Sequence, residues 1–312
     1  MNFRNPRQVY GETLVELAKS NHRIVVLEAD LGKSTMSCLF QQAFPERYFE
    51  MGIAEQNMTS FAAGLSLTGK IACINSFAVF ATGRNFDQIR QSICTANLNV
   101  KINGSSAGLS DFGDGASHQS VEDIAIMRAL PNMTVLVPAD GLETKKAVEA
   151  AVNLDGPVYL RITRSECDEI TPRDRAFTIG QPYVLREGQD IAIFACGMMV
   201  GISLEAAETL AEMGISARVV NVCSLKPLDE DAMHHVAKGV KGIVTAEEHS
   251  IIGGLACTIA YILRGTAIPQ ESVAIMDKFG QSAQNYQDLL EFYGLTQRDI
   301  VKASVKILKR NN

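Results

Sequence analysis

The sequence lacks several features that mark particular classes of protein. It has no cluster of basic residues, and its net charge is −6 over 312 residues. Because a nucleic-acid-binding surface needs clustered Lys and Arg to contact phosphates, we expect no nucleic-acid partner. The seven cysteines are odd in number, widely spread and never in C-x-x-C spacing, which favours neither a disulfide framework nor a zinc site. We therefore expect free thiols in a reducing compartment and no metal site built by this chain.

A segment for export or membrane insertion is missing as well. Segment 1–7 has no apolar region of the kind found in signal peptides, and the longest apolar stretch, Ile191 to Ile202, is too short to span a bilayer. No membrane partner and a cytoplasmic location are expected.

Common nucleotide and metalloprotease motifs are absent too. No G-x-G-x-x-G, no complete P-loop and no H-E-x-x-H occurs in the sequence. These absences leave a nicotinamide-binding Rossmann site, a P-loop nucleotide site and a zinc protease site unsupported.

Short β-rich apolar runs alternate with amphipathic segments along the whole chain, a pattern typical of parallel sheets covered by helices. A polar, proline-containing stretch after Ile162 interrupts the alternation and indicates a linker. The fold class predicted is therefore α/β, with two domains that are each a mainly parallel sheet flanked by helices. Strands are expected at 24–27, 71–74, 100–102, 134–137, 158–162, 190–195, 217–222, 242–247 and 273–276. Helices are expected near 7–19, 54–68, 83–97, 120–129, 141–153, 200–213 and 253–264, with two more at the end.

Glu55 is a lone carboxylate at the head of an apolar helical segment. Met58, Phe61, Ala62 and Leu65 recur at helical spacing, and Glu55 falls on the same predicted buried stripe. Burying a charge is costly unless it finds a partner, so a functional role is one interpretation. The other is that Glu55 occupies the first helical turn, where the helix dipole favours a negative side chain.

Two further segments suggest a ligand site. The glycine-flanked loop 109–119 contains Asp114 and His118 and follows a predicted strand, and ligands bind at the carboxyl ends of strands in open α/β sheets. His118 is a candidate acid, base or substrate ligand, or alternatively a cap of the helix predicted near residue 120. Phe77 and Phe80, directly after another strand, either present an aromatic face to a flat heterocycle or belong to the core. Arg164 follows the last strand of the first half, where it suits a phosphate or carboxylate or is simply a surface residue.

Together, Glu55, Phe77, Phe80 and the loop from Gly113 to Gln119 resemble the pyrimidine-binding half of transketolase, a thiamine diphosphate enzyme. The resemblance covers nearly the whole chain, and the motifs Lys226-Pro227-Leu228-Asp229 and Glu247-Glu248-His249 continue it into the second half. It implies a pyrimidine-binding domain over 1–168, a linker over 169–186 and a transketolase C-terminal domain over 187–312.

The resemblance also implies roles for individual residues. The glutamate matching Glu55 hydrogen-bonds a ring nitrogen of the cofactor's aminopyrimidine, which activates the cofactor's thiazolium carbon. Phe77 and Phe80 match residues that stack around the aminopyrimidine, and Asp30 falls in a loop near the cofactor. The residues that match contacts to the sugar hydroxyls are His118 and Asp114, and those that match contacts to the sugar phosphate are Arg164, Ser34 and Arg4.

The chain also departs from the family pattern. Full-length transketolases begin with a diphosphate-binding domain that holds Mg²⁺ (or Ca²⁺) and the cofactor's phosphates, and no segment here resembles it. The resemblance therefore implies an N-terminal partner subunit and an α2β2 heterotetramer with the cofactor between subunits. Gly83 stands where a third stacking aromatic is usual, and Ser105 or Ser106 where a phosphate-binding histidine is expected, which leaves the sugar phosphates open.

The function expected is the C-terminal subunit of a two-subunit transketolase, which moves a two-carbon ketol unit from a ketose phosphate to an aldose phosphate. One alternative is the β subunit of a 2-oxoacid dehydrogenase, or an enzyme like 1-deoxyxylulose-5-phosphate synthase. Another is a regulatory or structural subunit that keeps the fold without the chemistry.

Overall fold

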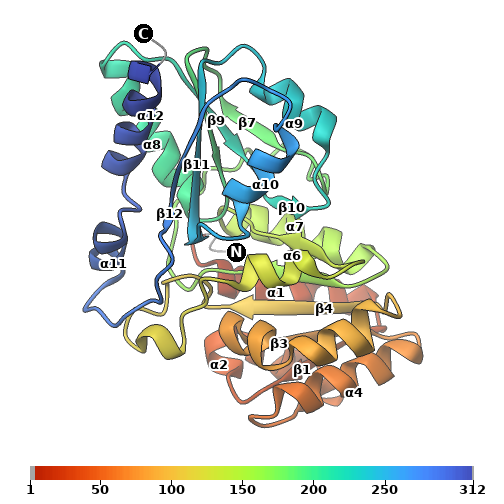
Figure 1. Cartoon of the computed structure of the whole chain (residues 1–312). Coiled ribbons are helices and arrows are strands. Elements are labelled where there is room, and N and C mark those ends of the chain that lie inside the picture. The colour runs from red at the N-terminus through yellow and green to blue at the C-terminus, as the bar shows by residue number, and fades with distance from the viewer. Residues whose placement is uncertain (1–3, 311–312) are drawn as a thin grey trace.

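The computed structural model describes residues 4–310 and has two α/β domains, each built on a mainly parallel sheet with helices on its faces (Figure 1). This confirms the predicted fold class. All strand pairs are parallel except those of β10 and β7, which each run antiparallel to their neighbour. The first sheet has the order β10-β5-β6-β4-β3-β1-β2, and its strands are β1 (Ile24–Glu28), β2 (Tyr48–Glu50), β3 (Ile71–Phe77), β4 (Val100–Ser105), β5 (Thr134–Leu136), β6 (Val158–Arg161) and β10 (Ser224–Lys226). The second has the order β12-β11-β8-β9-β7, with β7 (Tyr183–Arg186), β8 (Ile191–Ala195), β9 (Ala217–Asn221), β11 (Gly242–Ser250) and β12 (Gln270–Ile275).

Some of the helices begin at residues that cap a helix with their side chain. Asn5 caps α1 by accepting from the Gln8 N–H, and Asp140 caps α7 by accepting from the Glu143 N–H. In the first domain the helices are α1 (Pro6–Ser20), α2 (Gly32–Thr35), α3 (Cys38–Ala43), α4 (Glu55–Leu67), α5 (Phe86–Gln88), α6 (Asp123–Ala129) and α7 (Gly141–Asn153). In the second they are α8 (Met199–Glu212), α9 (Glu230–Ala237), α10 (Leu255–Ile262), α11 (Tyr286–Tyr293) and α12 (Gln297–Arg310). Within residues 4–310, no helix is long and apolar enough to cross a membrane.

The helix predicted over 83–97 is not a regular α-helix. Over 83–97 the chain forms a π-helical turn at Phe80–Arg84, then α5, then a second π-helical stretch at Ile89–Cys94. A π turn closes over five residues rather than four, so it shifts the faces of the helix relative to a regular 3.6-residue repeat. Arg84 is the last residue of the first π turn.

The two domains are joined by more than the linker. Strand β10 follows β9 of the second domain but pairs with β5 of the first sheet. Strand β7 lies within the segment expected to be the linker and pairs with β9. Several short elements, among them β2, β7 and β10, do not stand out in the sequence, because three or four residues are too few for a periodic pattern.

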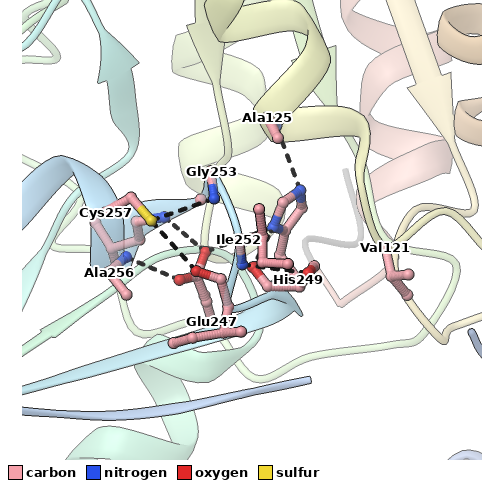
Figure 2. A network of polar contacts seen from close by, with 12 residues as sticks. Val121, Ala125, Glu247, His249, Ile252, Gly253, Ala256 and Cys257 are labelled. Atoms are coloured by element: carbon pink, nitrogen blue, oxygen red, sulfur yellow. Dashed lines mark hydrogen bonds and ion pairs between the residues drawn. The ribbon is translucent and has the colours of Figure 1, made fainter. Parts of the chain in front are cut away.

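A buried polar network also holds the end of β11 against α6 (Figure 2). The Ala125 N–H donates to His249 Nε2 at 3.3 Å, and His249 Nδ1 lies 2.8 Å from the Ser250 carbonyl oxygen. His249 therefore has a proton on Nδ1 and none on Nε2, and burial lowers its pKa. Nearby, the Ser250 N–H donates to the Val121 carbonyl at 2.7 Å, so the two domains share backbone hydrogen bonds.

Candidate functional site

Glu55 is the first residue of α4, and its side chain is only 2% exposed. Met58 and Ala62 are fully buried on the same face, as the helical spacing predicts. Phe61 is different, because it is 43% exposed and packs at a tilt against Phe49, with 5.8 Å between the ring centroids. The buried stripe of α4 is thus narrower than expected, and Glu55 lies on it.

The buried carboxylate of Glu55 has a cationic partner. Arg84 Nη1 donates to Glu55 Oε1 at 2.8 Å and to Oε2 at 3.0 Å. The guanidinium also lies over the ring of Phe80, 4.5 Å from its centroid. The Arg84 side chain is 46% exposed, so the ion pair joins a buried acid to a base that reaches the surface.

The predicted aromatic pair and the predicted histidine lie together. Phe77, the last residue of β3, and Phe80, the first of the π turn, have ring centroids 6.3 Å apart and planes only 12° from parallel. The His118 ring lies edge-on to both, at 6.1 Å from Phe77 and 5.2 Å from Phe80. Glu55, Phe77, Phe80 and His118 are therefore linked through Arg84 and the stacked rings.

His118 does not cap helix α6. Helix α6 begins at Asp123 with Glu122 in the cap position, five residues further on than His118. His118 instead follows a short 3₁₀ turn, Gly115–Ser117, and its Nδ1 lies 2.9 Å from Ser117 Oγ. Asp114 precedes that turn and is exposed.

The loop that presents His118 is held by the second domain. The Ala283 N–H donates to the Phe112 carbonyl at 2.8 Å, and Gln119 Nε2 donates to the Gln281 carbonyl at 3.0 Å. Gly115 has φ of 74°, and a Cβ there would collide with Ser282. Only glycine combines that backbone conformation with that close approach.

Arg164 belongs to a second, charged group of residues. Its Nη1 donates to Asp111 Oδ2 at 2.9 Å, and Asp111 is 4% exposed. Arg7 donates from Nη1 to the Ser34 carbonyl at 2.7 Å, so Ser34 is tied to the same area through its backbone. Burial, and then the charge of Arg164, lower the pKa of Arg7, and Asp111 offsets part of that shift. Arg7 and Arg164 therefore act on each other electrostatically, and guanidinium groups suit a phosphate.

Asp30 lies in the loop between β1 and α2 and has φ of 61°. Its N–H donates to Glu50 Oε1 at 2.9 Å, and it lines a cavity of about 480 Å³ together with Ser34 and Tyr48. The buried Glu28 organises this loop. Its carboxylate accepts from the N–H groups of Ala29 and Leu31 and from the hydroxyls of Thr35 and Ser37, and burial raises its pKa to about 7.

Arg4 lies elsewhere on the first domain. It forms an ion pair with Asp168 at 3.5 Å and lines a cavity of about 450 Å³ together with Gly201 and Glu205 of α8. Within residues 4–310, no group of three or more His, Cys, Asp or Glu side chains is arranged to hold a metal ion.

Some site residues were missed in the sequence. Arg84 and Arg7 gave no signal, since a single arginine has no pattern that reveals its partner. Glu28 does carry a signal, because it ends the apolar run Ile24–Glu28, whose five residues are all buried. The segment from Gly104 to Gly108 has the G-x-S-x-G spacing. Ser106 there has φ of 51° and a buried Oγ with no hydrogen-bond partner among residues 4–310, but no helix directly follows it as in a hydrolase nucleophile elbow.

Both domains of the chain match known protein families. Residues 4–169 match the model of the transketolase pyrimidine-binding domain, and residues 180–300 match that of the transketolase C-terminal domain. The chain is 42% identical to a putative transketolase C-terminal section from Methanocaldococcus jannaschii, over 99% of this chain and 98% of that protein. It is 41% identical to a subunit of a 6-deoxy-6-sulfo-D-fructose transketolase from a Clostridium species, over 98% of this chain and 95% of that protein.

Two solved structures are similar as well. A split-gene transketolase, described as an inactive β4 tetramer, superposes with a TM-score of 0.90 at 50% identity and covers 98% of both chains. Transketolase from Campylobacter jejuni superposes with a TM-score of 0.83 at 22% identity, over 96% of this chain and 46% of that one, and so supports the fold alone.

Fold and matches together define a protein with a pyrimidine-binding domain followed by a transketolase-type C-terminal domain. The chain belongs to the transketolase family. It matches the C-terminal section that split transketolases carry as a separate chain.

Proposed function

We propose that this chain is the C-terminal subunit of a two-subunit, thiamine diphosphate-dependent transketolase, which transfers a two-carbon ketol unit from a ketose phosphate to an aldose phosphate. The observation that carries the proposal is the buried Glu55, which Arg84 links to Phe80, together with the nearly parallel rings of Phe77 and Phe80. An aminopyrimidine needs an acceptor or donor for its ring nitrogen and flat apolar faces for its ring, and this set of side chains offers both.

When bound, thiamine diphosphate supplies the carbon nucleophile for ketol transfer. The residues of this chain would bind the cofactor and orient it. Glu55 would bind a ring nitrogen of the aminopyrimidine, and Phe77 and Phe80 would pack against the ring. Asp30 is assigned to the cofactor's surroundings, because its loop follows β1 at the same sheet edge as Phe77.

Substrate contacts are assigned to the charged and polar groups at the same edge. His118 would contact the sugar hydroxyls and move a proton there, since its ring reaches the aromatic pair and carries ionisable nitrogens. Asp114, exposed at the start of the His118 turn, would bind a further hydroxyl. Arg164 and Ser34 would hold the phosphate, with Arg7 close by. Arg4, which lines a different cavity from Ser34, is assigned as a further contact to the substrate.

The proposal includes a partner. We infer that an N-terminal transketolase subunit supplies the diphosphate-binding domain and Mg²⁺ (or Ca²⁺), in an α2β2 heterotetramer. The M. jannaschii and Clostridium relatives, described as a C-terminal section and a subunit, support a division of this kind. The similar β4 tetramer is described as inactive, which fits a C-terminal section that needs a partner.

Reconstitution tests the function. The chain is mixed with a purified N-terminal transketolase subunit, thiamine diphosphate and Mg²⁺, and ketol transfer between sugar phosphates is followed. Activity should need both chains, and Glu55→Ala should abolish most of it. Full activity of Glu55→Ala would overturn the assigned mechanism.

Two alternative functions can be tested with the same reconstituted protein. Decarboxylation of pyruvate or a branched 2-oxoacid, followed with an artificial electron acceptor, would indicate the β subunit of a 2-oxoacid dehydrogenase. Absence of thiamine diphosphate binding in the presence of the partner, measured by isothermal titration calorimetry, would indicate a regulatory or structural subunit.

A further inference from the structure

A cavity of about 350 Å³ lies where the linker passes between the two domains. Its lining includes Glu143 of α7, Asn221 at the end of β9 and Ser224 of β10, together with linker residues from Thr171 to Pro182 and Tyr183 of β7. A volume of this size is within the range of small-molecule sites. None of its lining residues belongs to the candidate site described above.

The floor of the cavity is a set of buried polar groups contributed by both domains. Glu143, Asn221 and Ser224 are 6%, 3% and 1% exposed. Asn221 Nδ2 donates to Glu143 Oε1 at 2.8 Å and to Oε2 at 3.0 Å, which fixes the orientation of the Asn221 amide. Glu143 Oε2 also accepts from the Ala139 N–H at 2.7 Å.

One acceptor of this floor is unused. With Nδ2 committed to Glu143, Asn221 Oδ1 is buried and has no hydrogen-bond partner among the described residues. Leaving a buried carbonyl oxygen unpaired is costly, because it has lost its hydrogen bonds to water without a replacement. A ligand that brings a hydroxyl donor to this oxygen would remove that cost, whereas an acceptor-only ligand would not.

The linker wall is held in place by Lys146. Its Nζ donates to the carbonyl oxygens of Pro172, Arg173 and Arg175 at 2.9, 3.2 and 2.7 Å. All three N–H bonds of the ammonium are therefore used for the linker backbone. Lys146 shapes the wall and has no donor left for a ligand.

Arg175, in contrast to Lys146, has side-chain donors that are not used by any described residue. Its guanidinium carbon lies 3.0 Å from the centroid of the Tyr183 ring, so the group is held over the aromatic face at the cavity wall. No hydrogen bond or ion pair from the Arg175 side chain is found among residues 4–310. A guanidinium has five N–H donors, and a stacked guanidinium with its donors unused is suited to a carboxylate or phosphate.

We propose that the linker cavity is a second ligand site, which binds a small hydroxylated anion. The anionic group pairs with Arg175, and a hydroxyl donates to the unused carbonyl oxygen of Asn221 beside Glu143. Because Glu143 and Asn221 belong to different domains, the bound molecule bridges the first domain, the second domain and the linker. A sugar acid and a sugar phosphate both have the required chemistry.

Isothermal titration of the full chain, without thiamine diphosphate, separates these sources. The probes are D-glycerate, glycerol 3-phosphate and inorganic sulfate, which has no hydroxyl donor at neutral pH. We expect at least one of the two hydroxylated anions to bind more tightly than sulfate. Stronger binding of D-glycerate would identify a carboxylate ligand, and stronger binding of glycerol 3-phosphate a phosphate ester.

The site is located with a matched pair of linker variants. Arg175→Met keeps the apolar stem and removes the charge, and should weaken binding roughly tenfold to a hundredfold, as expected for the loss of a charge-assisted hydrogen bond. Arg173→Met is the control, because Arg173 pairs with Glu169 on the surface and does not line the cavity. Circular dichroism of both variants checks that the fold is kept.

Three outcomes would overturn the proposal. The first is no binding of any probe at millimolar concentration. The second is binding that Arg175→Met leaves unchanged. The third is equal binding of inorganic sulfate and the hydroxylated anions, since this would show an arginine that attracts any anion. These outcomes do not depend on ketol transfer, so they leave the proposed function untouched.

Discussion

Arg84 Nη1 lies within hydrogen-bonding distance of both carboxylate oxygens of Glu55, at 2.8 and 3.0 Å. The same guanidinium rests on the ring of Phe80. The carboxylate proposed to bind the cofactor is thus already paired within this chain. In the proposed holoenzyme, a ring nitrogen of the cofactor and Arg84 would share the oxygens of Glu55 or compete for them.

The ion pair is expected to stabilise the chain measurably. Arg84→Met should lower the free energy of unfolding by about 1–3 kcal/mol, because Glu55 would remain buried without its charged donor. In a Glu55→Gln background, Arg84→Met should lower the free energy of unfolding by less, since no buried charge is left unpaired. Urea unfolding of the four proteins in this double-mutant cycle gives the coupling free energy between the two residues. An equal loss of stability from Arg84→Met in both backgrounds would show that the ion pair does not stabilise the chain.

The sequence predicted the parts of the site that depend on a repeating pattern. Glu55 was placed on a buried helix face by the 3.6-residue period, and Phe77 and Phe80 were placed at a sheet edge by the strand before them. Arg84 could not be found this way. It lies 29 residues from Glu55, and it ends a π turn, where the helical period does not hold.

Long-range pairings set a similar limit for the fold. Parallel sheets in two domains follow from the alternation of apolar runs and amphipathic segments. The pairing of β10 with the first sheet cannot be predicted in this way, since a strand of three residues with one antiparallel neighbour is too short to show a periodic pattern. Glu28 was open to prediction, because an acid that ends a fully apolar strand candidate is as unusual as Glu55.

The backbone conformation of Gly115 supports a second prediction. Gly115→Ala should lower the free energy of unfolding by roughly 2 kcal/mol, because the new Cβ meets Ser282 while φ stays near 74°. Urea unfolding measures the change. Gly113→Ala is the control on the same loop, since nothing lies within 4 Å of a Cβ built there. Similar losses in both variants would show that the second domain does not constrain the loop.

Asp111 gives a prediction about substrate binding that depends on the proposed function. Asp111→Asn removes the charge that orients Arg164, so the reconstituted enzyme should need roughly tenfold more of a phosphorylated donor for half-maximal rate, with little change in kcat. Steady-state kinetics with an unphosphorylated ketose is the control, and its KM should stay the same. A fall in kcat for both donors would instead indicate that Asp111 supports the fold of the site.

Glu28 provides a test of the buried charge beneath the Asp30 loop. Burial raises its pKa from the ordinary value of 4.5 to about 7, so the folded chain holds this proton more tightly than the unfolded chain. The resulting stabilisation is fully present below pH 4.5 and is lost as the pH rises through 7. Its size is roughly 3 kcal/mol, from 1.36 kcal/mol per pKa unit.

Glu28→Gln should remove this dependence. The carboxamide oxygen of the variant can still accept from the N–H groups of Ala29 and Leu31, and its amide can donate to the hydroxyls of Thr35 and Ser37, which can rotate to accept. Relative to the wild-type chain, the variant should therefore gain up to roughly 3 kcal/mol between pH 4.5 and pH 8 in urea unfolding. Ile24→Val on the same strand is the control, and should cost about 1 kcal/mol at both pH values. A stability difference for Glu28→Gln that does not change with pH would mean that this carboxyl does not hold its proton on folding.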